Sequence, residues 1–286
     1  FGRLTSTISF CVTLFFLHLG GFEYVDLIAR EYGSGSITTA LFFFGIIMFG
    51  GELISIPFSY YSTFVIEERF GFNKSTKKIF FTDIVKGWML SALFGSLILS
   101  AIIFLHQYIG QDFWIYAWVL LTVFTIIINM LYSSVIVPLF NKQTPLEDGV
   151  LKDQLSAHAA GVGFDIKNIF VIDGSKRSSK ANAYFSGFGR KKRITLYDTL
   201  IDDLEVDEIV AVLAHEVGHF KRKHIIYNMI LSAVITGLTF YVFSLFVSNP
   251  LLSYALGVST SSFHVGLIGF GLLVSYLSYI IYSFLI

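Results

Sequence analysis

Long apolar runs separated by short polar gaps make up most of this chain. A helix needs about 20 mostly apolar residues to cross the hydrocarbon core of a bilayer. Runs of that kind lie at 4–28, 37–65, 84–106, 113–137, 225–247 and 263–286. The pattern therefore predicts six membrane-spanning helices, of which the first is polar for its length.

One stretch breaks this pattern. Residues 141–224 hold 13 of the 20 Lys and Arg residues and 12 of the 20 Asp and Glu residues. A charge density of this kind indicates a water-exposed domain inserted between membrane helices. The chain is therefore divided into an N-terminal transmembrane region at 1–138 with about four spans, a water-exposed domain at 139–224, and C-terminal transmembrane helices at 225–286.

Local patterns in the water-exposed domain predict a small α+β unit. Residues 147–162 have helical periodicity, and a turn-rich stretch covers 174–180. Short apolar strands are predicted at 168–173, 181–187 and 193–197. Residues 187–192 link the last two strands as a plausible hairpin. The predicted fold class is a multi-spanning α-helical membrane protein with an inserted small α+β domain.

The sequence His215-Glu216-Val217-Gly218-His219 matches the HExxH pattern and follows a helical segment that begins at Asp207. Acidic residues in the first turn of a helix stabilise it through the helix dipole. On a helix, His215 and His219 share one face at i and i+4, with Glu216 beside them. Two imidazoles and an adjacent carboxylate are the minimal apparatus of a zinc hydrolase. The alternative is a pair of surface histidines on an amphipathic helix.

Overall composition limits the partners. Hydrophobic residues make up 55% of the chain, the formal net charge is zero, and the mean hydropathy is +0.71. A neutral chain gives no electrostatic reason to expect a nucleic-acid partner, so we expect none; membrane lipid is the expected surrounding. The basic clusters at 190–193 and 221–223 favour the cytoplasmic side for the polar domain. Cys11 is the single cysteine and cannot form an internal disulfide.

Several motifs in order along the chain resemble the integral-membrane, zinc-dependent CAAX prenyl endopeptidase family. They are YYSTFVIEERFGFNKST at 60–76, PLFNK at 138–142 with Pro145-Leu146, VIDGSKRSSKANAYFSGFG at 171–189, KRITLYDTL at 192–200 and AVLAHEVGHFKRKH at 211–224. The likeness runs over nearly all 286 residues. It implies a Zn²⁺ cofactor held by His215 and His219, and Glu216 as the catalytic base.

The resemblance also implies a substrate-binding edge and a third metal ligand. Asn182, Ala183 and Tyr184 would lie on a strand edge that pairs with the substrate main chain, although an ordinary edge strand is the equal alternative. Relatives supply a Glu from a later helix as the third ligand, and no Asp or Glu follows Glu216 here. We expect that Glu beyond Ile286, because both chain ends have the character of cuts. His264 is interpreted as structural.

The predicted function is a membrane-embedded zinc metalloendopeptidase of the gluzincin-like, CAAX-processing type. Its partner would be a peptide or protein substrate, prenylated or not. The location would be a bacterial inner membrane, or the endoplasmic reticulum membrane in a eukaryote, with the catalytic domain facing the cytoplasm. Two alternatives stay open: a membrane quality-control protease that degrades misfolded proteins, and a catalytically silent membrane scaffold.

Overall fold

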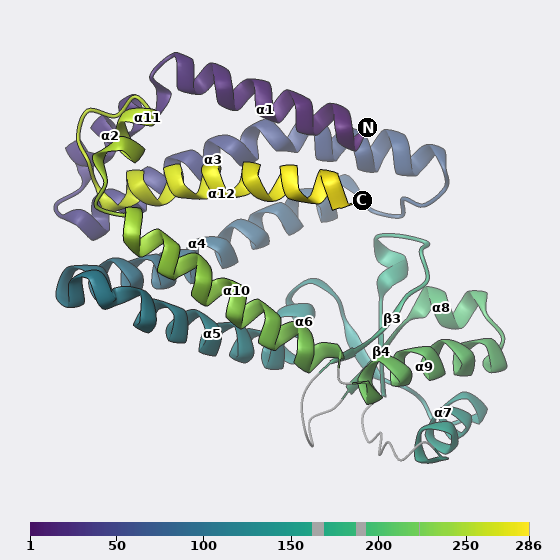
Figure 1. The fold of residues 1–286 in the computed structure, drawn as a ribbon. Coiled ribbons are helices and arrows are strands. Elements are labelled where there is room, and N and C mark those ends of the chain that lie inside the picture. The colour runs from purple at the N-terminus through teal and green to yellow at the C-terminus, as the bar shows by residue number, and fades with distance from the viewer. Residues whose placement is uncertain (162–168, 187–192, 223, 286) are drawn as a thin grey trace. The chain divides into compact units, whose positions relative to one another are not determined.

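The computed structural model describes residues 1–161, 169–186, 193–222 and 224–285 (Figure 1). Inside elements, the side chains of 159, 185, 216–217, 219–221, 224–225 and 276–285 are outside the description. The chain forms two compact units. Unit 1 comprises 1–59, 88–121 and 235–286, and unit 2 comprises 60–87 and 122–234.

Unit 1 is built from helices and helix segments. They are α1 (Gly2–His18), α2 (Gly21–Tyr32), most of α3 (Ser36–Tyr61), most of α4 (Lys77–Ile109), the 3-10 turn Gly110–Asp112, the first half of α5 (Phe113–Leu131), the end of α10 (His224–Phe246), α11 (Pro250–Ala255) and α12 (Phe263–Leu285). Helices satisfy every backbone hydrogen bond within the segment, as a bilayer core requires. Gly20 and Gly110 adopt φ values of 69° and 74°, which favour glycine where the chain turns between helices.

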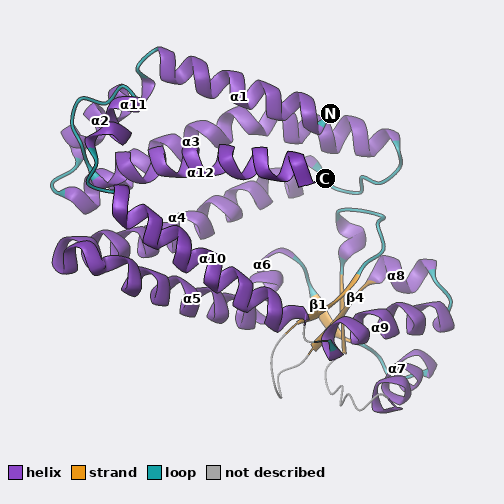
Figure 2. Cartoon of the chain, viewed as in Figure 1, coloured by secondary structure: helices purple, strands orange, loops and turns teal. Residues whose placement is uncertain are grey.

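Unit 2 contains a four-stranded mixed sheet (orange in Figure 2) and the helices around it. Its helices include the π-helical segments Ser62–Glu67 and Tyr132–Ile136, α6 (Val137–Phe140), α7 (Val150–Gly161), the 3-10 turn Gly174–Lys176, α8 (Asp198–Asp203) and α9 (Val206–Lys221). The start of α4, the end of α5 and the start of α10 also belong to this unit. Its strands are β1 (Gln143–Pro145), β2 (Ile169–Ile172), β3 (Ala183–Ser186) and β4 (Arg193–Tyr197).

The sheet order is β1-β2-β4-β3. The strand β2 pairs with β1 in the antiparallel sense and with β4 in the parallel sense, whereas β3 pairs with β4 in the antiparallel sense. Ile194, Thr195 and Leu196 are all buried, as expected for a central strand. Among the residues that the structure describes, β3 therefore lies at one edge of the sheet, with β4 as its single ladder partner.

The predicted strands and the helix at 147–162 agree with the observed elements to within a few residues. The antiparallel pairing of β3 and β4 is present, while the connecting residues 187–192 lie outside the described residues. The short strand β1 was not predicted, because three residues with a proline carry no strand pattern.

The predicted membrane spans agree in part. Among the residues described, the helical segments 36–67, 77–140 and 226–246 are long and apolar enough to cross a bilayer. The segment 77–140 contains both α4 and α5, so it covers two of the predicted spans. The span predicted at 4–28 as one helix is wrong: α1 and α2 meet at an angle of 67°, and the pair counts at most as one broken span.

The buried acid Asp26 of unit 1 is paired with two cationic or polar side chains. Asp26 and His264 are 1% and 3% exposed, and His264 Nε2 lies 2.6 Å from Asp26 Oδ1. Arg30 Nε donates to the other oxygen of Asp26 at 2.6 Å. A buried charge is tolerated only when it is paired. In unit 2, the Asn129 side-chain amide donates to the Thr125 carbonyl one turn back in its own helix, at 2.8 Å.

Candidate active site

Helix α9 begins with its own hydrogen-bond cap. The carboxylate of Glu208 accepts a hydrogen bond from the backbone N–H of Glu205 at 2.9 Å, which satisfies one of the donors that a helix start leaves free. The acidic side chains of Asp207 and Glu208 also oppose the helix dipole in the first turn. From there the helix runs without a break to Lys221, as the sequence predicts.

The sheet fixes which way α9 faces. Ile209 and Leu213 are 1% and 2% exposed and belong to one hydrophobic cluster with Leu155, Ile194 and Leu196. At 3.6 residues per turn, His215 lies about 160° around the helix from Leu213. Consistent with that position, the side chain of His215 is exposed. Packing of one helix face thus turns the first histidine of the motif away from the core.

The positions of Glu216 and His219 are described for the backbone only. The unbroken helix places position 219 one turn after His215 on the same side, as the motif requires. The side chains of Glu216 and His219 lie outside the described residues. Among the residues described, no three His, Cys, Asp or Glu side chains gather as a metal site. Two imidazoles one turn apart are a donor set that fits a borderline-soft ion such as Zn²⁺.

The edge strand β3 lies against α9. The backbone N–H of Tyr197 donates to the Asn182 carbonyl at 3.0 Å, so residues 182, 184 and 186 direct their main-chain groups toward β4. In an antiparallel ladder the alternate residues face the other way. Main-chain groups of Ala183 and Phe185 therefore face the open edge. Phe185 was not among the residues predicted, because the inward or outward choice depends on the register with β4.

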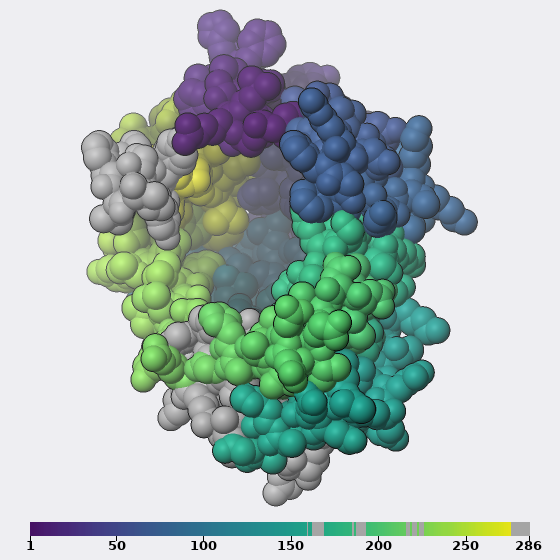
Figure 3. All heavy atoms as spheres, turned by 90° about the vertical axis from the view of Figure 1, so that its right-hand side faces the viewer, coloured from purple at the N-terminus to yellow at the C-terminus, as the bar shows by residue number. Residues whose placement is uncertain are grey.

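The described side chain of Tyr184 on this strand packs against the sheet and carries no charge near pH 7. The ring of Tyr184 contacts that of Tyr197 edge-on, with 6.5 Å between centroids. Burial raises the pKa of the Tyr184 phenol, so the group is neutral near pH 7. Three acidic side chains on α8 and the first turn of α9, those of Asp202, Asp203 and Asp207, are exposed. The segment that carries them is drawn in green in Figure 3.

Unit 1 contains a separate apolar cavity of about 480 Å³ between α3 and α4. Its wall includes Phe49 and Trp88, whose rings meet edge-on at 5.1 Å, and Leu267 of α12. Gly95 leaves room, since nothing lies within 4 Å of where its Cβ would be. Glu52 is the one acidic side chain in the lining. Cavities of 300–1,000 Å³ with apolar walls are typical of ligand sites.

A Ser-His-Asp cluster in unit 1 is not a second hydrolytic site. Ser262 Oγ lies 3.2 Å and Asp26 Oδ1 lies 2.6 Å from the same nitrogen, Nε2 of His264. A catalytic triad needs the base and the orienting acid on opposite ring nitrogens. This arrangement cannot relay a proton from serine, and it fits the structural role predicted for His264.

Comparison with known proteins gives the family. Residues 1–142 match the family model described as CAAX prenyl protease N-terminal, five membrane helices, and residues 145–285 match the model of peptidase family M48. The chain belongs to peptidase family M48. This membership confirms the predicted resemblance and implies a metal cofactor.

Named relatives extend the comparison. The chain is 43% identical to the CAAX prenyl protease 1 homolog of Arabidopsis thaliana over 82% of this chain and 55% of the relative. It is 44% identical to CAAX prenyl protease 1 of Saccharomyces cerevisiae over 77% of this chain and 48% of the relative. The human CAAX prenyl protease 1 homolog is 32% identical over 77% of this chain and 54% of the relative. The chain spans about half the length of these relatives.

A solved structure confirms the fold class. The crystal structure of S. mikatae Ste24p superposes with a TM-score of 0.90 and 35% identity, over 96% of this chain and 69% of that chain. The protein is thus an integral, multi-pass membrane protein with a small α/β region that carries a mixed sheet.

The orientation of α9 can be tested through its buried face. Replacing Leu213 by Ala removes side-chain volume from the cluster with Leu155 and Ile194, and such core truncations cost about 2–5 kcal/mol. We expect the full-length protein in detergent to unfold at a clearly lower temperature. Ala211→Ser, on the exposed side of the same helix, is the control and should leave the unfolding temperature unchanged. Equal unfolding temperatures for the two variants would show that this face is not buried.

Proposed function

We propose that this protein is a membrane-embedded zinc metalloendopeptidase of the CAAX prenyl protease type. The observation that carries the proposal is the unbroken helix α9, which bears His215, Glu216 and His219 beside the edge strand β3. Membership of peptidase family M48 supports the same chemistry.

The metal ion would be held by His215 and His219, with a Glu outside the described residues as the third ligand. Bound there, Zn²⁺ supplies Lewis-acid polarisation of the scissile carbonyl and makes water acidic enough to react near neutral pH. The exposure of the His215 side chain, with Leu213 buried on the far side of the helix, supports this role.

Glu216 acts as the general base and then as the general acid. It takes a proton from the attacking water and later gives that proton to the amine that leaves. The edge of β3 positions the peptide. The main-chain groups of Phe185 and the carbonyl of Ala183 pair with the substrate backbone, while Asn182 and Tyr184 hold the strand to β4. The N–H of Ala183 is already bonded to the Asn182 side-chain oxygen at 2.9 Å.

The substrate class follows from the relatives and from unit 1. The names of the relatives state that they are CAAX prenyl proteases. The apolar cavity between α3 and α4 offers a membrane-embedded wall of the kind that an isoprenyl chain would contact. A silent scaffold is disfavoured by the intact motif on an intact helix.

The catalytic domain at 139–224 would face the cytoplasm, between transmembrane regions at 1–138 and 225–286. The exposed Arg222 supports this side, since cationic residues next to membrane helices favour the cytoplasm. In a eukaryotic cell the membrane would be the endoplasmic reticulum, and in a bacterium the inner membrane.

Replacing Glu216 by Gln tests the catalytic role. The amide cannot take a proton, and loss of a general base lowers kcat by about 10²–10⁴-fold. The measurement is cleavage of a fluorogenic prenylated peptide by the full-length protein in detergent. Asp207→Asn removes one negative charge from the exposed start of the same helix and should leave kcat unchanged. Wild-type turnover by the Glu216→Gln protein would refute the role.

Filling the cavity tests the substrate class. Gly95→Leu places a side chain in the cavity and should displace about two methylene groups of a bound farnesyl chain. Each methylene group that is no longer buried costs about 0.8 kcal/mol of binding free energy, so KM for a farnesylated peptide should rise about tenfold. The KM for the same peptide without the farnesyl group should not change. Gly50→Leu, with equal open space on α3 outside the cavity, is the matched control. An equal change in KM for the two peptides would show that the cavity does not bind the farnesyl group.

A further inference from the structure

The segment that leads into β3 is tied to a loop between membrane helices. The backbone N–H of Lys74 donates to the Arg177 carbonyl at 3.0 Å, and that of Ser179 donates to the Phe72 carbonyl at 3.0 Å. Asn73 and Ser178 form an antiparallel bridge between these bonds. All of these residues belong to unit 2. A short extra ladder thus holds the approach to the edge strand.

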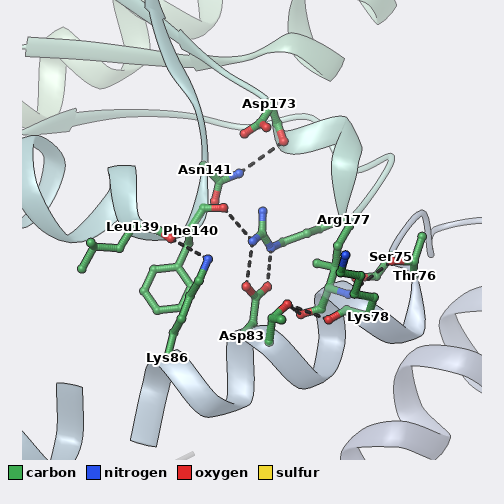
Figure 4. A network of polar contacts seen from close by, with 12 residues as sticks. Ser75, Thr76, Lys78, Asp83, Lys86, Leu139, Phe140, Asn141, Asp173 and Arg177 are labelled. Atoms are coloured by element: carbon green, nitrogen blue, oxygen red, sulfur yellow. Dashed lines mark hydrogen bonds and ion pairs between the residues drawn. The ribbon is translucent and has the colours of Figure 1, made fainter. Parts of the chain in front are cut away.

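Arg177 anchors this ladder from the side (Figure 4). Its Nε donates to Asp83 Oδ2 at 2.7 Å and its Nη2 donates to Asp83 Oδ1 at 3.0 Å, which makes a bidentate pair with α4. The same Nη2 donates to the Phe140 carbonyl at the end of α6, at 2.7 Å. Both charged side chains are 24% exposed. Bidentate, charge-assisted bonds fix direction as well as distance.

Further bonds secure both sides of Arg177. On one side, the side-chain amide of Asn141 donates to the Asp173 carbonyl at 3.2 Å, as Figure 4 shows. On the other, Lys180 Nζ lies 2.7 Å from Glu67 Oε1. The hydroxyl of Thr199 donates to the Lys180 carbonyl at 3.1 Å, three residues before β3 begins.

The strand β3 needs this support because it is four residues long and has one ladder partner. A strand whose second edge must stay open for a peptide cannot be fixed by a second strand. We infer that Arg177 is a positioning residue for peptide cleavage: through Asp83 and Phe140 it holds β3 in the place where its open edge can pair with substrate. This inference rests on the proposed function and assigns Arg177 no contact with the reacting atoms.

The test is Arg177→Lys, which keeps the charge and loses the bidentate geometry. The contact between β3 and the substrate backbone stabilises the ground state and the transition state equally. Weakening that contact should therefore raise KM for a peptide about tenfold and leave kcat nearly unchanged. The assay uses the full-length, metal-loaded protein, with metal content and unfolding temperature measured on the same preparation.

Arg193→Lys is the matched control. Arg193 donates to the Ser133 carbonyl and to Gln143 Oε1, both at 3.1 Å, and lies over the Phe170 ring, away from the open edge. The control should lower the unfolding temperature and leave KM unchanged. A merely structural Arg177 would behave in the same way, so equal KM values for wild type and Arg177→Lys would overturn the inference.

Asp83→Asn provides a second route if Arg177→Lys does not fold. It should raise KM in the same direction, and an unchanged KM would overturn the inference as well. When both variants fold, the double variant should be no worse than Arg177→Lys alone, since residues that act through one contact are not additive. Absence of cleavage by the wild-type protein would instead refute the proposed function.

Discussion

The burial of Ile209 and Leu213 against the sheet is the contact on which the rest of the candidate site depends. Because these side chains fill one face of α9, the rotation of the helix about its axis is fixed. That rotation decides where position 215 lies, and the strand β3 beside the helix decides where a peptide could lie. A metal motif on a helix free to rotate would have no defined relation to a substrate. The small core of unit 2 therefore determines the direction in which the motif on α9 faces.

The bilayer imposes the second constraint. Peptide hydrolysis needs water and charged groups, whereas helices such as α3 and α5 are suited to lipid and tolerate polar groups only when these are satisfied. Most of the charged residues lie in unit 2, and the buried Asp26 of unit 1 is paired with His264 and Arg30. In unit 2, the polar Asn129 bonds to the backbone of its own helix.

The sequence predicted those features that local pattern encodes. Helix α9 follows from its acidic first turn and apolar spacing, and the strands β2, β3 and β4 follow from short apolar runs between turns. Features that depend on distant partners could not be predicted. The parallel pairing of β2 with β4, and hence the exposure of β3 as an edge, is set by the fold. Arg177 and Asp83 are separated by 94 positions, and no periodicity links them. The bend at Gly20 was not predicted, because a run of apolar residues does not indicate whether the helix axis changes direction within it.

The motif on α9 is proposed to hold one metal ion through His215 and His219. Elemental analysis of the full-length protein, purified in detergent without added metal, is the measurement that decides this. We expect one zinc per chain in the wild type and a large loss of zinc in His215→Ala and in His219→Ala. Absence of zinc from the wild type, or equal zinc in wild type and both variants, would contradict it.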